Sequence, residues 1–257
     1  MQIRGGHAIC INSAKGGVGK TFFTINLAGL LSRQSKRVLI IDLDLYSGGI
    51  GMALNINNNA SVYDLIEDIK TNRYQSFDHY VTKYNDLIDV VIAPNDPREA
   101  IKTDSAYLSN IISYAKHKYD AILIDTTHVF DATNVVALEK ADHIIEIVTN
   151  DPLDIKNTSN TIKLFKETKI NNYHLLLNEA IFPDKNYFTL FDIKQILKTN
   201  VDYIISCRLH IKNYDKYIID GKILSLDDRA YNKYKCEWDK LELLLNNLFK
   251  ETNEGVK

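Results

Sequence analysis

The chain has 257 residues, 45% of them apolar and 25% charged, with a formal net charge of -2 at pH 7, an ordinary composition for a soluble globular protein. The near-neutral total does not indicate strong DNA binding, and the widely spaced Cys10, Cys207 and Cys236 form no metal or redox motif. Because no apolar run is long enough for a signal peptide or a spanning helix, we expect a cytoplasmic protein.

Short apolar segments alternate along the chain with segments of helical periodicity. The expected strands are Ala8–Ser13, Val38–Asp42, Val90–Ala93, Ala121–Asp125, Ile144–Thr149, Tyr173–Asn178 and Tyr203–Ser206. The expected helices are Phe22–Leu31, Ser61–Ile69, Ala106–His117, Ile155–Phe165 and Leu190–Leu197. Ser61 and Asp154 are the expected N-caps of two of them.

This alternation predicts an α/β fold, a doubly wound, mostly parallel sheet flanked by helices, because near-continuous apolar strands suit a sheet covered on both faces. No Pro/Gly-rich linker or repeat marks a boundary. We therefore expect residues 1–250 to form a single domain and residues 251–257 to form a disordered tail.

The strongest chemical signal follows the first predicted strand, where Lys15-Gly16-Gly17-Val18-Gly19-Lys20-Thr21 precedes an apolar helix. Glycines let the backbone wrap around phosphate oxygens, and the exposed amides attract the anion. Lys20 supplies a charge at the β- and γ-phosphates, and the Thr21 hydroxyl is a ligand for Mg²⁺. A chance Gly-rich turn is the alternative, but the strand-to-helix context favours a site for ATP or GTP.

This run resembles the deviant Walker A motif of the ParA/MinD superfamily of P-loop NTPases. The resemblance implies ATP and Mg²⁺ as cofactors and a homodimer with ATP sandwiched at its interface. Lys15 would reach across that interface to the other protomer's nucleotide, whereas the alternative is a solvated surface lysine. The expected nucleotide contacts in the loop are Gly16, Gly17, Val18, Gly19, Lys20, Thr21 and Phe22.

Carboxylates stand where two predicted strands end. Asp42 and Asp44 follow Val38–Ile41, and Asp125 ends Ala121–Ile124. Parallel strands deliver ligands at their carboxyl ends, and hard oxygen ligands suit Mg²⁺. By resemblance, Asp125 is the Walker B carboxylate, Asp42 lies near the metal with Thr21, and Asp44 orients the attacking water as a catalytic residue beside Lys15 and Lys20. A simple loop cap is the alternative for each aspartate.

The segment Ile41–Asn55 narrows the resemblance. It carries Asp-Leu-Asp-Leu, then an aromatic and polar pair, glycines and an Ala-Leu helix, and so looks like the CpaE/TadZ branch, whereas ParA proteins usually continue Asp-Pro-Gln. Ser61–Ile66, Val91–Ala100 and Tyr119–Asp125 also match this branch, and the likeness spans Ala8 to Leu226.

The CpaE/TadZ resemblance implies a localisation factor for assembly of the tight-adherence (Flp, type IV) pilus. A protein of the pilus or secretion apparatus is then the expected partner, recruiting the chain to a cell pole or the membrane face. The branch commonly has an N-terminal receiver-like domain. We expect that domain to be absent, naturally or by truncation, because the first predicted strand begins at Ala8.

Several departures from the family pattern bear on catalysis. Phe22 replaces a second hydroxyl residue, and Asp125–His128 lacks the usual prolines. Asn178 occupies the position that contacts adenine in the superfamily, with a loop asparagine as its alternative reading. Glu179 and Ser206–Arg208 also depart from the pattern around the base. We therefore expect slow ATP hydrolysis and a role as a switch.

Other functions are weighed against this one. A MinD- or FlhG-like membrane-associated ATPase would use the apolar stripe of Asp227–Lys250, but that segment has no net charge, which favours a helix packed on the core. A ParA-like DNA-partitioning ATPase would use scattered lysines such as Lys156, Lys163, Lys166 and Lys169. Their pattern favours the solvated surface of a helix instead. Iron–sulfur scaffold ATPases need bridging cysteines, and bacterial tyrosine kinases a dense tyrosine cluster that Tyr231 and Tyr234 do not supply.

Overall fold

An eight-stranded sheet forms the centre of the protein in a computed structural model that describes residues 5–57, 60–181 and 187–254. Its strands lie in the order β3-β4-β2-β5-β1-β6-β7-β8. All neighbours are parallel except the edge pair of β3 and β4. The strands are β1 His7–Asn12, β2 Val38–Leu43, β3 Thr82–Lys83, β4 Ile88–Val91, β5 Ala121–Thr126, β6 His143–Thr149, β7 Tyr173–Asn178 and β8 Tyr203–Ile205. This confirms the predicted α/β architecture.

Helices connect these strands and cover both faces of the sheet. The α-helices are α1 Lys20–Arg33, α2 Gly49–Ala53, α3 Val62–Lys70, α4 Pro97–Lys102, α5 Leu108–Lys118, α6 Ala132–Lys140, α7 Pro152–Glu167, α8 Leu190–Leu197, α9 Tyr214–Ile219, α10 Asp228–Lys233 and α11 Lys235–Glu254. The 3-10 turns are η1 Phe77–Tyr80, η2 Ser105–Tyr107, η3 Cys207–Leu209 and η4 Leu224–Leu226.

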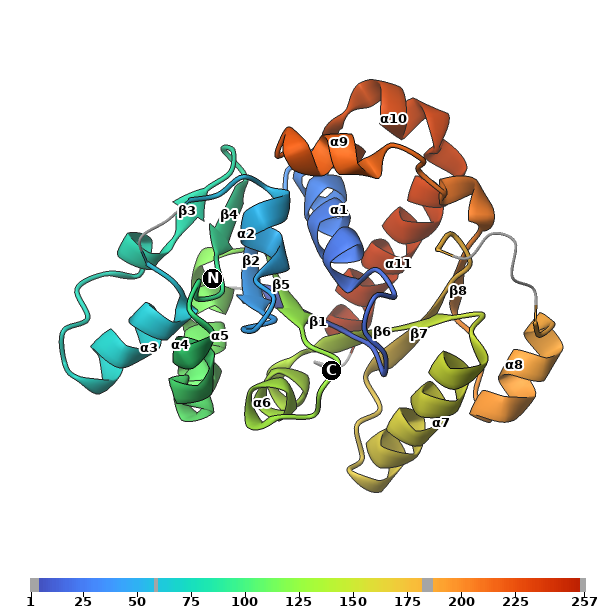
Figure 1. Ribbon diagram of the computed structural model, residues 1–257, viewed down its shortest axis with the longest axis horizontal. Helices are drawn as coiled ribbons and strands as arrows, with labels where there is room; N and C mark the ends of the chain where they lie inside the picture. Colours follow the sequence, from blue (N-terminus) through green and yellow to red (C-terminus); the bar gives the residue numbers. More distant parts are fainter. Residues whose placement is uncertain (1–4, 58–59, 182–186, 255–257) are drawn as a thin grey trace.

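Alternate residues of each strand enter different cores, as strand geometry requires. Ile9 and Ile11 of β1 join the core beneath α1 and α11, whereas Ala8 and Cys10 join the core beneath α3 and α5. Figure 1 shows α1 and α11 on one side of the sheet and α5, α6 and α7 on the other. The sheet is therefore a buried central layer, and its carboxyl edge is left to carry polar groups.

One predicted N-cap is wrong and one is confirmed. Ser61 caps α3, and Asp64 completes a reciprocal capping box with it. The cap of α7 is Asp151, not Asp154, because Pro152 begins that helix and Asp151 accepts hydrogen bonds from Leu153 and Asp154. Asp154 is instead buried, where it accepts hydrogen bonds from the backbone and hydroxyl of Thr149.

The C-terminal segment is two helices, since α10 ends before Tyr234 and α11 begins at Lys235. Trp238, Leu241, Leu245 and Leu248 of α11 are fully buried against the sheet core. This confirms the interpretation of the apolar stripe as core packing. The helix continues to Glu254, and residues 255–257 of the predicted tail lie outside the described residues.

Candidate functional site: a phosphate loop at the carboxyl edge of the sheet

A glycine-rich loop connects β1 to α1 at the centre of the carboxyl edge. Gly17 and Gly19 adopt φ values of +75° and +101°, which only glycine adopts without strain. Gly19 is also packed closely, because a Cβ there would lie 3.3 Å from Nδ2 of Asn178. The loop ends at the first turn of α1, so its amides and the helix dipole face the same space.

Lys20 lies at the start of α1 with its side chain directed back into this loop. Its side chain is only 8% exposed, and its Nζ donates a hydrogen bond to Oγ of Ser13 at 3.0 Å. The Ser13 hydroxyl in turn donates to the carbonyl of Lys15 at 2.8 Å. A buried ammonium group is thus held under the loop, where a phosphate oxygen would provide the missing anionic partner.

Two carboxylates stand side by side next to Lys20. Asp42 and Asp125 are register partners on β2 and β5, and both are fully buried. Oδ2 of Asp125 accepts a hydrogen bond from Oγ1 of Thr21 at 2.7 Å. Asp42 accepts hydrogen bonds from the amides of Asp44 and Ile50, each at 3.1 Å. The structure therefore brings together the three predicted metal ligands, Thr21, Asp42 and Asp125.

The electrostatics of this pair fit a divalent cation. Burial raises the pKa of Asp125 to about 6, and hydrogen bonds from Thr21 and the charge of Lys20 oppose the increase. Burial and the nearby charge of Asp125 also raise the pKa of Asp42 well above its ordinary range. Two buried carboxylates and a hydroxyl supply hard oxygen donors, which form a set that suits Mg²⁺.

Asp44 lies in the segment that leads from β2 to α2. It is partly exposed, and its carbonyl accepts hydrogen bonds from Ser47 and Gly48, which close a tight turn. The turn reaches the predicted metal ligand Thr21, because a Cβ at Gly49 would lie 3.3 Å from the Thr21 hydroxyl. Asp44 is thus at the margin of the phosphate site, where solvent has access.

Lys15 lies at the outer edge of the loop and is held within its own chain. Its Nζ lies 3.1 Å from Oδ1 of Asp151, and the two side chains are 34% and 19% exposed. Burial opposes ionisation of Asp151, but the hydrogen bond from the amide of Asp154 and the contact with Lys15 outweigh it and lower the pKa of that carboxyl. Sequence reasoning did not identify Asp151, because the residue contacts Lys15 only through the fold.

A cavity of about 360 Å³ adjoins the loop on the side of β7 and η3. Phe22, Asn178, Ile211 and Tyr214 contribute to its walls, and the rings of Phe22 and Tyr214 meet edge to face with centroids 5.0 Å apart. Apolar and aromatic walls beside a phosphate loop are suited to a nucleotide base. We call this space the base cavity.

Asn178 is positioned between the loop and the base cavity. Its Nδ2 donates to the carbonyl of Val18 at 3.0 Å, and its Oδ1 accepts from the amide of Ala180 at 3.1 Å. The side chain therefore fastens β7 to the phosphate loop. Direct contact with a base remains a prediction.

Ser206 and His128, which depart from the family pattern, each contact a distant part of the chain. Ser206 donates its hydroxyl to Oε1 of Glu237 at 2.8 Å, which fastens the end of β8 to α11. The imidazole of His128 lies against the loop, 3.4 Å from where a Cβ of Gly16 would be. Neither contact could be read from the sequence, because each joins elements far apart in the chain.

Glu146 is a further buried acid that the sequence pattern did not reveal. It lies within β6 and accepts a hydrogen bond from Nδ2 of Asn12 at 2.7 Å. Burial raises the pKa of this carboxyl to about 8. In the sequence Glu146 interrupts an apolar strand and belongs to no motif. Only the fold shows that it lies next to Asn12, where the phosphate loop begins.

A family model described as an AAA domain matches residues 6–177. The septum site-determining protein MinD of Synechocystis sp. is 27% identical over 175 residues, which are 66% of this chain and 63% of that protein. The chain thus matches less than two thirds of that relative's length.

Two solved structures share the fold. A ParA family ATPase from Chlorobium tepidum superposes with a TM-score of 0.79 at 21% identity, covering 90% of this chain and 98% of the other. MinD of Pyrococcus horikoshii, solved with Mg-ADP, superposes with a TM-score of 0.74 at 20% identity, covering 92% and 97%.

Proposed function

The chain belongs to the AAA domain family and to the ParA/MinD superfamily of P-loop ATPases, and we propose that it is an ATP-dependent dimerising switch that positions a cellular machine. The observation that carries this proposal is the convergence of a glycine loop, the buried ammonium group of Lys20 and the Thr21–Asp125 pair at one edge of the sheet. The structure of MinD from Pyrococcus horikoshii with bound Mg-ADP supports a nucleotide and Mg²⁺ as the cofactors.

The residues of the phosphate loop perform the binding. Amides from Gly16 to Thr21 surround the phosphates, and Lys20 neutralises their charge. Thr21, Asp42 and Asp125 would hold Mg²⁺, which would neutralise further charge on the phosphates. Phe22 and Asn178 border the base. Asp44, at the exposed margin of the site, orients the attacking water.

Lys15 is the residue that makes the switch depend on two copies. In the separate chain its ammonium group is neutralised by Asp151. In the proposed dimer it exchanges this partner for the nucleotide of the other protomer. The γ-phosphate is then the differential ligand that favours the dimer, and hydrolysis releases it. We expect this hydrolysis to be slow.

The test is molar mass by light scattering with Mg·ATP and with Mg·ADP, for the parent and for Lys15→Ala. We expect a dimer only with ATP and only for the parent. Lys163→Ala, an exposed lysine on α7, is the matched control and should dimerise like the parent. An unchanged mass of the parent in both nucleotides would remove the role assigned to Lys15.

For the machine that is positioned, the resemblance to the CpaE/TadZ branch favours assembly of a type IV (Flp) pilus. A protein of the pilus or secretion apparatus is the proposed partner, bound by the ATP dimer. Retention of purified pilus-assembly proteins on the immobilised chain should require Mg·ATP and be lost with Lys15→Ala. Retention of mixed-sequence DNA under the same conditions would favour a ParA-like function instead.

A MinD-like association with the membrane surface is the other alternative. No helix in the described part of the chain is long and apolar enough to cross a membrane. The apolar stripe of α11 is buried in the core, and Leu243 on its outer side is 54% exposed, so this helix does not offer a continuous apolar face to lipid. Any recruitment to the membrane is therefore proposed to occur through partners.

A further inference from the structure

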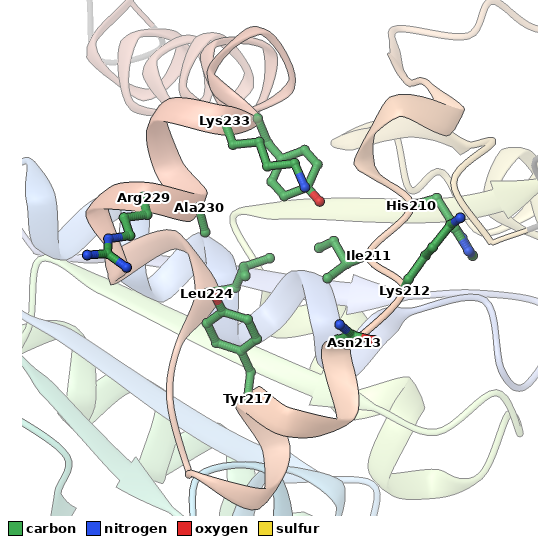
Figure 2. Close-up of a pocket in the computed structure, with 10 residues that line it drawn as sticks. His210, Ile211, Lys212, Asn213, Tyr217, Leu224, Arg229, Ala230 and Lys233 are labelled. Atoms are coloured by element: carbon green, nitrogen blue, oxygen red, sulfur yellow. The ribbon is translucent and has the colours of Figure 1, made fainter.

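A second cavity, of about 470 Å³, lies beside the base cavity. His210 and Ile211 line both cavities, so the segment between η3 and α9 is a shared wall. The other walls come from α9, η4 and α10, and Figure 2 shows them surrounding the space. We call this space the basic cavity, for the charges described below.

The middle of the basic cavity is apolar. Leu224 and Ala230 are buried, and Ile211 and Tyr217 are half-buried. In Figure 2 the side chains of Ile211, Leu224 and Ala230 lie around the centre of the space. Its volume and its mixture of apolar walls with a few polar groups are typical of sites for small organic molecules.

The edge of the cavity carries positive charge. Lys212, Arg229 and Lys233 line it, and no aspartate or glutamate does. None of these three side chains forms an ion pair with a carboxylate among residues 5–57, 60–181 and 187–254. In Figure 2, Lys233 extends over the space from α10, while Arg229 and Lys212 lie at opposite edges. The Lys233 ammonium group lies 4.9 Å from the ring centroid of Tyr234.

Nearby carboxylates have other partners. Asp228 forms an ion pair with Arg33 at 2.6 Å, and Asp227 accepts a hydrogen bond from the amide of Ala230 as the cap of α10. Asp220 pairs with Lys222 at 3.1 Å. Lys212, Arg229 and Lys233 form no ion pair with these carboxylates, so their charge is available to an anion at the edge of the cavity.

We propose that the basic cavity is a binding site for an organic anion that joins an apolar or aromatic body to a phosphate group. The apolar body would rest on Leu224, Ala230 and Ile211. The phosphate would accept hydrogen bonds from Lys212 and Lys233, and Lys233 would leave the Tyr234 ring to reach it.

Occupation of this cavity should also change nucleotide affinity. A ligand that contacts Ile211 and His210 bears on the shared wall, and the His210 ring is bonded through Nδ1 to the carbonyl of Ala180 at 2.9 Å, in the wall of the base cavity. This consequence rests on the proposed function. Binding to the basic cavity itself does not, because Lys212 and Lys233 do not line the base cavity.

The experiment is a calorimetric titration of the whole chain with 1-naphthyl phosphate in saturating Mg·ADP, which keeps the probe out of the phosphate loop and the base cavity. We expect one saturable site, with affinity weakened about tenfold or more in Lys212→Gln/Lys233→Gln because two charged hydrogen-bond donors are lost. Lys156→Gln/Lys163→Gln, the matched control on α7, should bind like the parent. 1-Naphthol and inorganic phosphate, which each lack half of the probe, should bind at least about tenfold more weakly.

Equal affinity of the parent and Lys212→Gln/Lys233→Gln for the probe would overturn the proposal. Binding of inorganic phosphate as tight as that of the probe would also overturn it, because the apolar walls would have no role. Mixed-sequence DNA that binds through the same lysines, with no binding of naphthyl phosphate, would assign them to a DNA surface and overturn the small-molecule site. A measurable change in ATP affinity with bound probe would support the coupling, and unchanged ATP affinity would reject it.

Discussion

At the scale of single residues, the contact between Lys15 and Asp151 opposes the exchange that the proposed dimer requires. Both side chains are partly exposed, so the ion pair contributes modestly, on the order of 0.5 kcal/mol per protomer. Asp151→Asn keeps a good N-cap for α7 and removes the charge. We expect it to strengthen the ATP dimer about threefold to tenfold, measured by analytical ultracentrifugation at limiting protein concentration. Weaker dimerisation of this variant would show that Asp151 acts at the interface itself.

We expect Glu146 to make the free energy of unfolding depend on pH. Its native pKa of about 8 lies above the ordinary value of 4.5, so the native state holds a proton that the unfolded chain releases between these values. Its contribution to stability is therefore fully present below about pH 4.5 and is lost as the pH rises towards about 8. Glu146→Gln removes this dependence.

The measurement is urea unfolding of Glu146→Gln and the parent between about pH 5 and pH 8. The stability of the variant relative to the parent should increase by up to about 1.4 kcal/mol per pH unit over this range. Glu139→Gln, an exposed position on α6, should show no such trend. A flat difference for Glu146→Gln would mean that this carboxyl is ionised in the native protein.

At the scale of elements, the packing of α1 against η4 depends on a glycine in the helix. A Cβ at Gly29 would lie 2.2 Å from Oγ of Ser225 and 2.7 Å from a methyl carbon of Ile223. Ser225 cannot move easily, because its amide and hydroxyl both bond to Asn26 of α1. Gly29→Ala should therefore lower the free energy of unfolding by about 1–3 kcal/mol in urea denaturation.

Gly51 of α2 is the matched position for this test. A Cβ there would have its nearest contact at 3.5 Å, and alanine has the higher helix propensity. Gly51→Ala should leave stability unchanged or slightly higher. If both variants lost equal stability, close approach at Gly29 would not be the cause.

Element types followed well from the sequence where apolar periodicity was strong. The seven predicted strands all exist, and β7 and α8 have the predicted bounds. The six-residue helices α4 and α9 were not predicted, because too few turns are present to establish a period. Helix α6 was also missed, although it has nine residues like the predicted α3. The break between α10 and α11 at Tyr234 was also missed, because Tyr231 and Tyr234 continue the apolar stripe of α11.

At the scale of the whole molecule, exposed apolar side chains gather where the proposed dimer would form. Val129, Phe130 and Leu153 are 53%, 39% and 65% exposed. Phe130 shares a cavity with Ala14 of the phosphate loop and with residues of α7. This surface is therefore continuous with the segment that carries Lys15.

Hydrogen exchange with mass spectrometry can test whether this surface is buried. With Mg·ATP, amides of 128–131 and 153–156 should exchange at least about tenfold more slowly than with Mg·ADP. The edge strand β3 should exchange equally in both states, and Lys15→Ala should abolish the protection. Protection that is equal with both nucleotides would contradict a switch controlled by the γ-phosphate.

The sequence by itself determined the fold class, the order of the strands along the chain and the phosphate loop. These features depend on local periodicity and on a contiguous motif, both of which are written in consecutive residues. It also identified Lys20, Thr21, Asp42 and Asp125 as a group, because carboxyl ends of parallel strands meet at one edge.

Only the tertiary structure decided which distant residues share a space. The pairing of Lys15 with Asp151, the burial of Glu146 under Asn12 and the basic cavity between η3, α9 and α10 each join segments that no local pattern connects. The physical reason is that burial and charge proximity depend on how layers pack, whereas periodicity only selects which face of an element is packed.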